Sequence, residues 1–195
     1  MSFKIAAIAT EYRLHSHADV IISRWLEPRP TDSLYQWGPP CTQIASMHLL
    51  QIPENDLSAE ISRKYGVPCF PSIREALTLG GDQLAVDAVL LIGEHGDYPL
   101  NDLLQKLYPR KEMFDEVAAV FRESGRSVPV FFDKHLSWNP ALAHEMYWTV
   151  RDLEIPFFGG SSIPQMALSD AVDLTNSREI VLAYWDSLEP YLFHS

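Results

Sequence analysis

Ionisable side chains gather in three short stretches of this chain, each directly after a short apolar run. The stretches are "TEYRLHSHAD" (10–19), "GEHGDYP" (93–99) and "DKHLSW" (133–138). Four of the seven histidines fall within them: His15, His17, His95 and His135. Imidazoles beside carboxylates suit a divalent metal ion or acid/base catalysis.

A metal centre is the first interpretation of this pattern. Zn, Mn or Fe would take histidine nitrogens and carboxylate oxygens from three loops that only the fold brings together. The candidate ligands are His15, His17, Glu94, His95, Asp133 and His135.

The same groups could also work without a metal ion. In that case His95 or His135 is a general base, Asp133 is a further candidate acid/base group, and Lys134 stabilises developing negative charge on an enolate or oxyanion. A polar site without catalysis is a third alternative.

A small polar substrate, carbohydrate-like or a hydroxy acid, is expected at this site. The candidate substrate contacts are Glu11, Arg13, Tyr98, Trp138, Ser161 and Ser162. The main functional prediction is therefore an enzyme that uses metal-assisted or acid/base chemistry. Isomerase, lyase and hydrolase activities are left open.

Short apolar runs alternate with segments of helical period, which predicts a parallel sheet with crossover helices. The expected strands cover 3–9, 43–49, 67–70, 85–93, 128–132 and 155–160. The expected helices cover 18–26, 55–66, 72–80, 111–125 and 139–154. We expect one doubly wound, Rossmann-like α/β domain over residues 1–162, with strand order 3-2-1-4-5-6. Ligands of such sheets bind at the carboxyl ends of the strands, where the three polar stretches lie.

Residues 163–195 form an aromatic-rich C-terminal tail. Its aromatic side chains need cover, either by packing on the sheet or by self-association into a homo-oligomer. The segment 27–41 is broken by prolines and is expected to be a surface loop.

Bulk composition excludes several classes of partner. A net charge of -11 argues against nucleic acid, whose phosphates need a positive face. No apolar run reaches the roughly 20 residues that cross a bilayer. Cys41 and Cys69 are expected to be free thiols, and without a secretory signal the expected location is the cytoplasm.

The turn after the first strand contains no glycine. A dinucleotide pyrophosphate usually binds glycine backbone N–H groups and a helix N-terminus at this position. The second strand also ends in "MHLLQ", without the acidic residue that holds a ribose. Both features argue against conventional NAD(P) binding.

Several stretches resemble the N-terminal domain of the glucose-fructose oxidoreductase and inositol dehydrogenase (Gfo/Idh/MocA) family. "AVDAVLLIGEHGDYP" is similar to the family's fourth strand and the loop after it, and "VPVFFDKHLSWNPALAHEMYWTVRDLEIPFFGG" to its "EKP" segment and the elements that follow. In this match Asp133 stands at the glutamate, Lys134 at the catalytic lysine and His135 at the proline. The motifs "EYR…SHAD", "GEHGDYP", "DKHLS" and "GSS.P" resemble most an uncharacterised bacterial subgroup.

The resemblance covers about residues 3–162 and implies two alternative functions. One is an NAD(P)-dependent oxidoreductase with Lys134 at the hydride-transfer centre. The other is a non-catalytic subunit or sensor that kept the family fold. The glycine fingerprint and the family's second, mostly β domain are both missing from this sequence.

Overall fold

The computed structural model describes residues 2–27 and 41–160 of the chain. These residues belong to one compact unit that runs to Gly160. Ser161, Ser162, most of the expected surface loop and the aromatic tail lie outside the described residues. The predicted roles of those segments, including self-association, therefore stay predictions.

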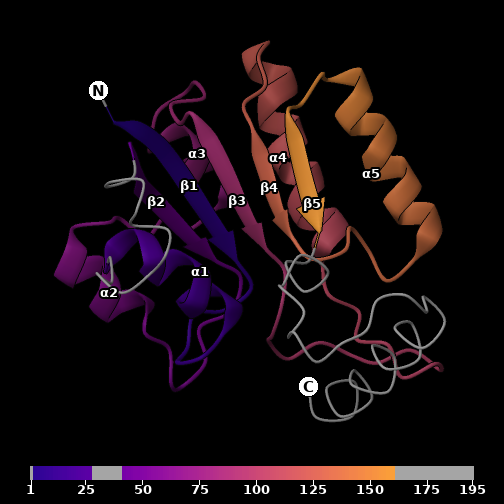
Figure 1. Ribbon diagram of the computed structural model, residues 1–195, viewed down its shortest axis with the longest axis horizontal. Coiled ribbons are helices and arrows are strands. Elements are labelled where there is room, and N and C mark those ends of the chain that lie inside the picture. Colours follow the sequence, from indigo (N-terminus) through magenta and orange to yellow (C-terminus); the bar gives the residue numbers. More distant parts are fainter. Residues whose placement is uncertain (1, 28–40, 161–195) are drawn as a thin grey trace, which may run out of the picture. The chain divides into compact units, whose positions relative to one another are not determined.

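Five parallel strands form the sheet, in the order β2-β1-β3-β4-β5 (Figure 1). They are β1 (Phe3–Ala9), β2 (Thr42–Leu49), β3 (Ala88–Ile92), β4 (Val130–Asp133) and β5 (Phe157–Gly160). Since every pairing is parallel, all carboxyl ends lie at one edge of the sheet. The predicted doubly wound, Rossmann-like α/β fold is confirmed.

The expected strand over 67–70 is reduced to a single parallel bridge between Met47 and Cys69. Pro68 has no N–H to donate, so it contributes only its carbonyl, which accepts from the Met47 N–H at 2.9 Å. The prediction of a sixth strand is wrong for this reason. The order of the remaining strands agrees with the predicted one. Cys41 and Cys69 are free and exposed, as expected.

Five helices lie among the described residues: α1 (His17–Leu26), α2 (Ser58–Tyr65), α3 (Ile73–Thr78), α4 (Arg110–Ser124) and α5 (Pro140–Asp152). Side-chain caps explain several of their starts. Ser16 caps α1, Ser72 caps α3, and Asn139 caps α5 with Pro140 at its first position. The start of α2 has Leu57 at the N-cap position without a side-chain cap, and the Asp56 carboxylate accepts the Ser58 N–H at 3.0 Å.

Alternation along β1 divides the core between the two faces of the sheet. Ala6 and Ile8 pack with α3 and α4 in one buried cluster. Ile5 and Ala7 pack in a second cluster with residues of α1 and β2. Helices therefore cover both faces, which is the meaning of doubly wound.

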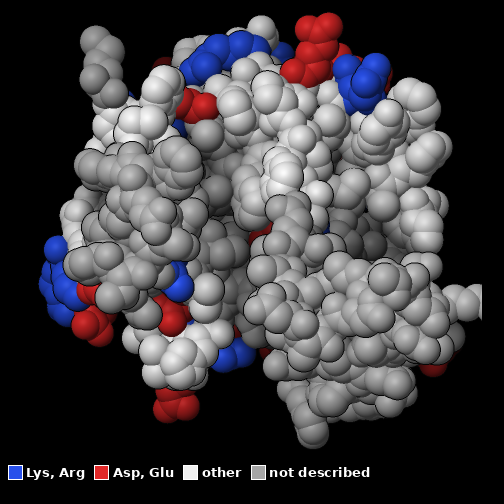
Figure 2. Space-filling view, in the orientation of Figure 1, with Lys and Arg blue, Asp and Glu red and all other residues white. Residues whose placement is uncertain are grey.

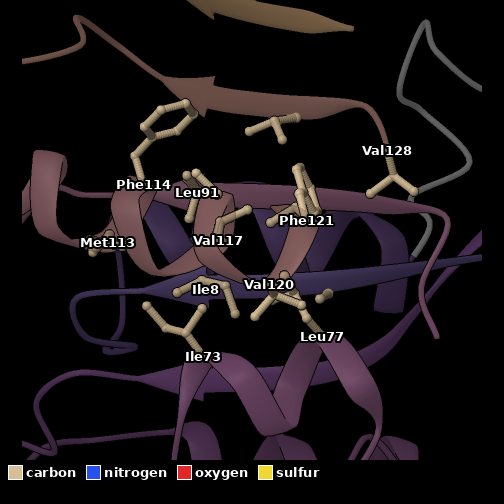
Figure 3. Close-up of a cluster of buried hydrophobic side chains, with 14 of the residues drawn as sticks. Ile8, Ile73, Leu77, Leu91, Met113, Phe114, Val117, Val120, Phe121 and Val128 are labelled. Carbon is tan, nitrogen blue, oxygen red and sulfur yellow. The ribbon is translucent and has the colours of Figure 1, made fainter. Parts of the chain in front are cut away.

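Figure 3 shows the first of these clusters. Ile8 and Leu91 of the sheet meet aliphatic side chains of α3 and a row of apolar side chains of α4. The row in α4 consists of Met113, Phe114, Val117, Val120 and Phe121. Its spacing is that of one helical face.

Charged side chains of both signs lie interspersed on the face shown in Figure 2. Within residues 2–27 and 41–160, no helix has the length and apolar character that crossing a membrane requires.

The buried α4 face makes a testable contribution to stability. Phe121 is 1% exposed, so Phe121→Ala leaves a cavity and should lower the free energy of unfolding by about 3–5 kcal/mol. Leu103→Ala is the control, because Leu103 is 77% exposed and should change it by less than about 0.5 kcal/mol. Urea denaturation followed by circular dichroism measures both; equal effects would contradict the assignment of this core.

Candidate functional site

The loops after β1, β3 and β4 come together at the carboxyl edge of the sheet. These three strands are neighbours, with β3 between β1 and β4. The Thr10 N–H donates to the Ile92 carbonyl at 3.1 Å, and the Thr10 hydroxyl donates to the Glu94 carbonyl. The polar stretches predicted to converge therefore do so.

His17 and Asp133 form a hydrogen-bonded pair. His17 is the first residue of α1 and Asp133 the last of β4, so the fold joins positions 116 residues apart. The distance from His17 Nδ1 to Asp133 Oδ2 is 2.5 Å, and the two side chains are 27% and 11% exposed. A carboxylate here fixes both the orientation of the ring and the nitrogen that carries its proton.

His95 lies beside this pair, at the end of β3. Its ring packs edge-on against His17, with 5.0 Å between centroids, and its Nδ1 lies 3.3 Å from Arg13 Nη2. Its Nε2 is buried without a hydrogen-bond partner among the described residues. Burial, and then the nearby His17 and Arg13, lower the pKa of His95. The lowered pKa favours the neutral ring, in which Nε2 is a buried hydrogen-bonding atom without a partner among the described residues.

Arg13 also pairs with Glu11. Its Nε lies 2.6 Å from Glu11 Oε1, where the Arg13 side chain is 34% exposed and the Glu11 side chain 7%. Arg13 therefore connects a buried carboxylate to His95. The two residues predicted as substrate contacts in this turn lie at the site.

Arg110 is a central residue that the sequence analysis missed. It is fully buried at the start of α4, and its Nη1 donates to the carbonyls of Asp133 at 2.7 Å and His135 at 3.0 Å. Its Nη2 pairs with Glu94. The available signal was its spacing, because Arg110 stands three and four residues before Met113 and Phe114, on the apolar face of the helix.

Two tyrosines line the loop after β3. Tyr98 and Tyr108 pack edge-on with 5.7 Å between ring centroids, and the Tyr98 hydroxyl is buried without a partner among the described residues. Burial raises the pKa of Tyr98 to about 12, so this hydroxyl keeps its proton. Gly96 is required beside it: φ is +103°, and a Cβ there would lie 2.6 Å from the Tyr98 ring.

Three residues of the predicted polar stretches adopt the left-handed backbone conformation that non-glycine residues usually avoid. They are His15 with φ 63°, His95 with φ 68° and Lys134 with φ 68°. Such strain persists where surrounding structure holds it, and it often occurs at functional sites. The Lys134 N–H donates to the Gly160 carbonyl at 3.2 Å, which supports one of these turns.

The predicted metal centre does not form, and that prediction is wrong. The described residues contain no group of three or more His, Cys, Asp and Glu side chains placed to hold a metal ion. Glu94 is committed to Arg110, and Asp133 to His17. His15 is exposed.

The remaining predicted site residues lie less centrally. The His135 side chain is exposed, although surrounding atoms and Arg110 lower its pKa. Trp138 is half-buried after the β4 loop. No side chain among the described residues pairs with the ammonium group of Lys134. The catalytic and substrate-binding roles predicted for all of these residues stay predictions.

The β1–α1 turn satisfies its own N–H groups through side chains. Ser16 Oγ accepts from the backbone N–H groups of Arg13 and Asp19, both at 3.2 Å. The Asp19 carboxylate accepts from the His15 N–H at 2.9 Å. These oxygens take the donors that a phosphate would use in a glycine-rich loop.

No protein-family model matches this chain, and no curated protein sequence matches it. Several solved structures, in contrast, are similar to this chain. Myo-inositol 2-dehydrogenase from Lactobacillus plantarum has a TM-score of 0.51 at 13% identity over 95% of this chain and 42% of its own. A protein from Bordetella bronchiseptica RB50 that is described as a dehydrogenase has a TM-score of 0.51 at 15% identity. This match covers 82% of this chain and 32% of the Bordetella chain. GenD2 from gentamicin A biosynthesis, solved in complex with NAD, has a TM-score of 0.50 at 11% identity. This match covers 82% of this chain and 34% of GenD2.

At these identities the similarity establishes the fold alone, a Rossmann-like α/β domain. The chain spans about a third to two fifths of the length of these neighbours. Two of them are described as dehydrogenases and the third was solved with NAD, so the resemblance stated from the sequence is supported at the level of the fold. The subgroup defined by the shared motifs stays a prediction.

The neighbours also overturn two predictions. The main functional prediction, a metal-assisted or acid/base isomerase, lyase or hydrolase, is wrong, because two of these neighbours are described as dehydrogenases and one was solved with NAD, which favours the oxidoreductase alternative. The prediction against NAD(P) is wrong as well, because one neighbour was solved with NAD bound. The absence of glycine from the turn after β1 was not a sufficient reason to argue against NAD(P).

The Arg110–Glu94 pair gives a second prediction. Arg110→Met leaves the Glu94 carboxylate, 13% exposed, without its buried partner, and should cost about 3–5 kcal/mol of unfolding free energy. Adding Glu94→Gln should recover part of this loss. Arg74→Met is the control, because the Arg74–Glu123 pair is exposed and should cost less than about 1 kcal/mol. Denaturant unfolding measures all of these; a double variant no more stable than Arg110→Met would contradict the pairing.

A third prediction concerns pH. The pKa of His95 is lower in the folded chain than its ordinary value of 6.5, so the unfolded chain binds the proton more readily. The contribution of His95 to the free energy of unfolding is fully present above about pH 6.5. It is lost as the pH falls through the pKa that His95 has in the folded chain. The groups facing His95 are His17, Arg13, Glu94 and Glu11.

His95→Asn tests this linkage, because asparagine tolerates the left-handed turn and does not titrate there. The loss of unfolding free energy between pH 7.5 and pH 5 should be smaller in His95→Asn than in the wild type. His144→Asn, on the exposed side of α5, should follow the wild-type curve. Urea unfolding at several pH values measures this dependence. Parallel plots of unfolding free energy against pH for all three proteins would refute the lowered pKa of His95.

Proposed function

We propose that this chain is the dinucleotide-binding domain of an NAD(P)-dependent oxidoreductase of the Gfo/Idh/MocA type. The observation that supports it most is the pair of orphaned polar atoms, His95 Nε2 and the Tyr98 hydroxyl, after the central strand β3. In sheets of this topology the cofactor and substrate bind at the carboxyl ends of the strands. The dehydrogenase neighbours, one of them with NAD bound, support the same conclusion.

The residues at the site fit such a cofactor in an unusual way. Because Ser16 and Asp19 occupy the backbone donors of the β1–α1 turn, the phosphates would need a side-chain partner. Arg13 offers one: its Nε and Nη2 face Glu11 and His95, which leaves Nη1 for a phosphate oxygen. Arginine binds phosphate oxygens through such planar N–H groups.

Lys134 is the residue that the proposal places nearest the reacting centre. It follows β4 directly, its left-handed turn is held by Gly160, and no described side chain pairs with its ammonium group. A free cation there would stabilise negative charge on the oxygen of a small hydroxylated substrate. The bound cofactor supplies the hydride acceptor.

Direct cofactor binding tests the proposal. NAD+, NADH, NADP+ and NADPH are titrated separately into the full chain, followed by calorimetry and, for the reduced forms, by nicotinamide fluorescence. At least one form should bind, and the absence of binding by all four at about 1 mM would overturn the proposal.

Arg13→Gln provides the residue-level prediction. Loss of one charge-assisted contact to phosphate should weaken the affinity for the cofactor about tenfold. Arg63→Gln is the matched control, because Arg63 is exposed on α2, and its affinity should equal that of the wild type. Equal affinities for all three proteins would remove Arg13 from the cofactor site.

A further inference from the structure

Hydrogen bonds join the chain segments that follow β1, β2 and β3 at one point of the sheet. In the strand order, β1 lies between β2 and β3. The Gln51 N–H, after β2, donates to the Thr10 carbonyl at 2.8 Å, and the Thr10 hydroxyl donates to the Glu94 carbonyl after β3. Thr10, the first residue after β1, is therefore bonded to the neighbouring segment on either side.

The Gln51 side chain connects the two outer segments directly. Its Nε2 donates to the Asp97 carbonyl at 3.0 Å, and its Oε1 accepts from the Asp97 N–H at 2.8 Å. A primary amide can pair in this way because it carries a donor and an acceptor side by side. Since β1 lies between β2 and β3, the Gln51–Asp97 pair spans the carboxyl end of β1.

Gly96 gives the Gln51 amide room to approach the loop after β3. A Cβ at this position would lie 3.0 Å from Gln51 Oε1, closer than ordinary van der Waals contact. Any other residue would therefore press on the amide that pairs with Asp97. The loop is shaped to receive the Gln51 side chain.

Residues 96–107 also carry hydrogen bonds of their own. The Leu107 N–H donates to the Pro99 carbonyl at 2.9 Å, and the Lys106 ammonium group donates to the Gly96 carbonyl at 3.3 Å. These bonds lie within the segment, so they persist when it moves as one body about residues at its ends. Such a movement breaks the Gln51–Asp97 pair.

We propose that the Gln51–Asp97 pair is a latch that opens before a dinucleotide binds, so that Gln51 controls the rate of cofactor association. In sheets of this kind, ligands bind outside the carboxyl ends of the strands, where the strand order reverses. That position lies between β1 and β3, beside the pair. The inference rests on the proposed oxidoreductase function and adds to it a residue that acts on access to the site.

The latch determines which fraction of the chain is open to the cofactor. If only the open fraction binds, the observed association rate constant is the intrinsic constant multiplied by that fraction. Both bonds of the latch are exposed, so water replaces them when it opens and their net contribution is small. Their removal should raise the open fraction about tenfold.

Hydrogen exchange at the Asp97 amide tests the latch without any cofactor. In NMR spectra of the 15N-labelled full chain, this amide should exchange about tenfold faster in Gln51→Ala than in the wild type. Gln51→Asn keeps the amide on a shorter side chain that cannot reach Asp97, and it should have the same effect. Gln83→Ala, at an exposed position before β3, is the control and should exchange like the wild type.

Equal exchange rates at Asp97 in the wild type and both Gln51 variants would overturn the inference. This result would not depend on nicotinamide binding, so it is distinct from a failure of the proposed function.

Stopped-flow fluorescence of NADH and NADPH then measures the control of association. For the form that binds, the association rate constant should be about tenfold larger in Gln51→Ala than in the wild type and Gln83→Ala, with the dissociation rate constant unchanged. A change in dissociation alone would make Gln51 a direct contact of the cofactor and overturn the latch. Equal association rate constants would overturn it too.

A different outcome would contradict the proposed function itself. If neither reduced cofactor bound to the wild type or to Gln51→Ala, the proposed function would fail and the latch with it. Binding to Gln51→Ala with weak or slow binding to the wild type would support both.

Discussion

The buried guanidinium of Arg110 is the constraint on which the geometry of the site depends. Removing this charge from water is costly, so the surrounding chain must supply compensating oxygens. It does so from two strand ends, with the Glu94 carboxylate after β3 and the carbonyls of Asp133 and His135 at the end of β4. One side chain thus ties together the loops that carry His95 and Lys134.

This constraint explains features of the neighbouring sequence. At Gly93 a Cβ would lie 2.9 Å from Arg110 Cγ, so the close approach of the guanidinium requires glycine there. The carbonyls of Asp133 and His135 must both point toward Arg110, and Lys134 between them adopts φ 68°. The strained backbone at Lys134 is therefore compensated by buried hydrogen bonds on either side.

The pairing of Arg110 with Glu94 also decides what the other charges can do. Glu94 forms an ion pair with Arg110, so Arg110 is not available to the other carboxylates. Asp133 pairs instead with His17, and Glu11 pairs with Arg13. As a result, His17 Nδ1 lies against a carboxylate and His95 Nδ1 against a guanidinium. Glu94 cannot turn toward a metal ion without leaving the buried Arg110 guanidinium unpaired.

Sequence patterns predicted the convergence of the site because it follows from topology. Parallel neighbouring strands bring His17, His95 and Asp133 to one edge whatever their side-chain partners. The partners themselves were not predictable, since residue type does not show that Glu94 faces Arg110 and not a ligand. Arg110 was missed because a charged residue at the start of a helix is normally solvated, and only its place on the apolar face of α4 indicates burial.

The turn after β1 shows how the cofactor prediction failed. A glycine-rich loop leaves backbone N–H groups open, and bound phosphate satisfies them. Here Ser16 and Asp19 satisfy those groups in the absence of any ligand, so the turn is stable by itself. In the proposed function, recognition of the cofactor phosphates would then come from a side chain, and Arg13 is the cation that the turn supplies. Since Glu11 and His95 already orient its guanidinium, a ligand would find it preorganised, with little side-chain entropy left to lose.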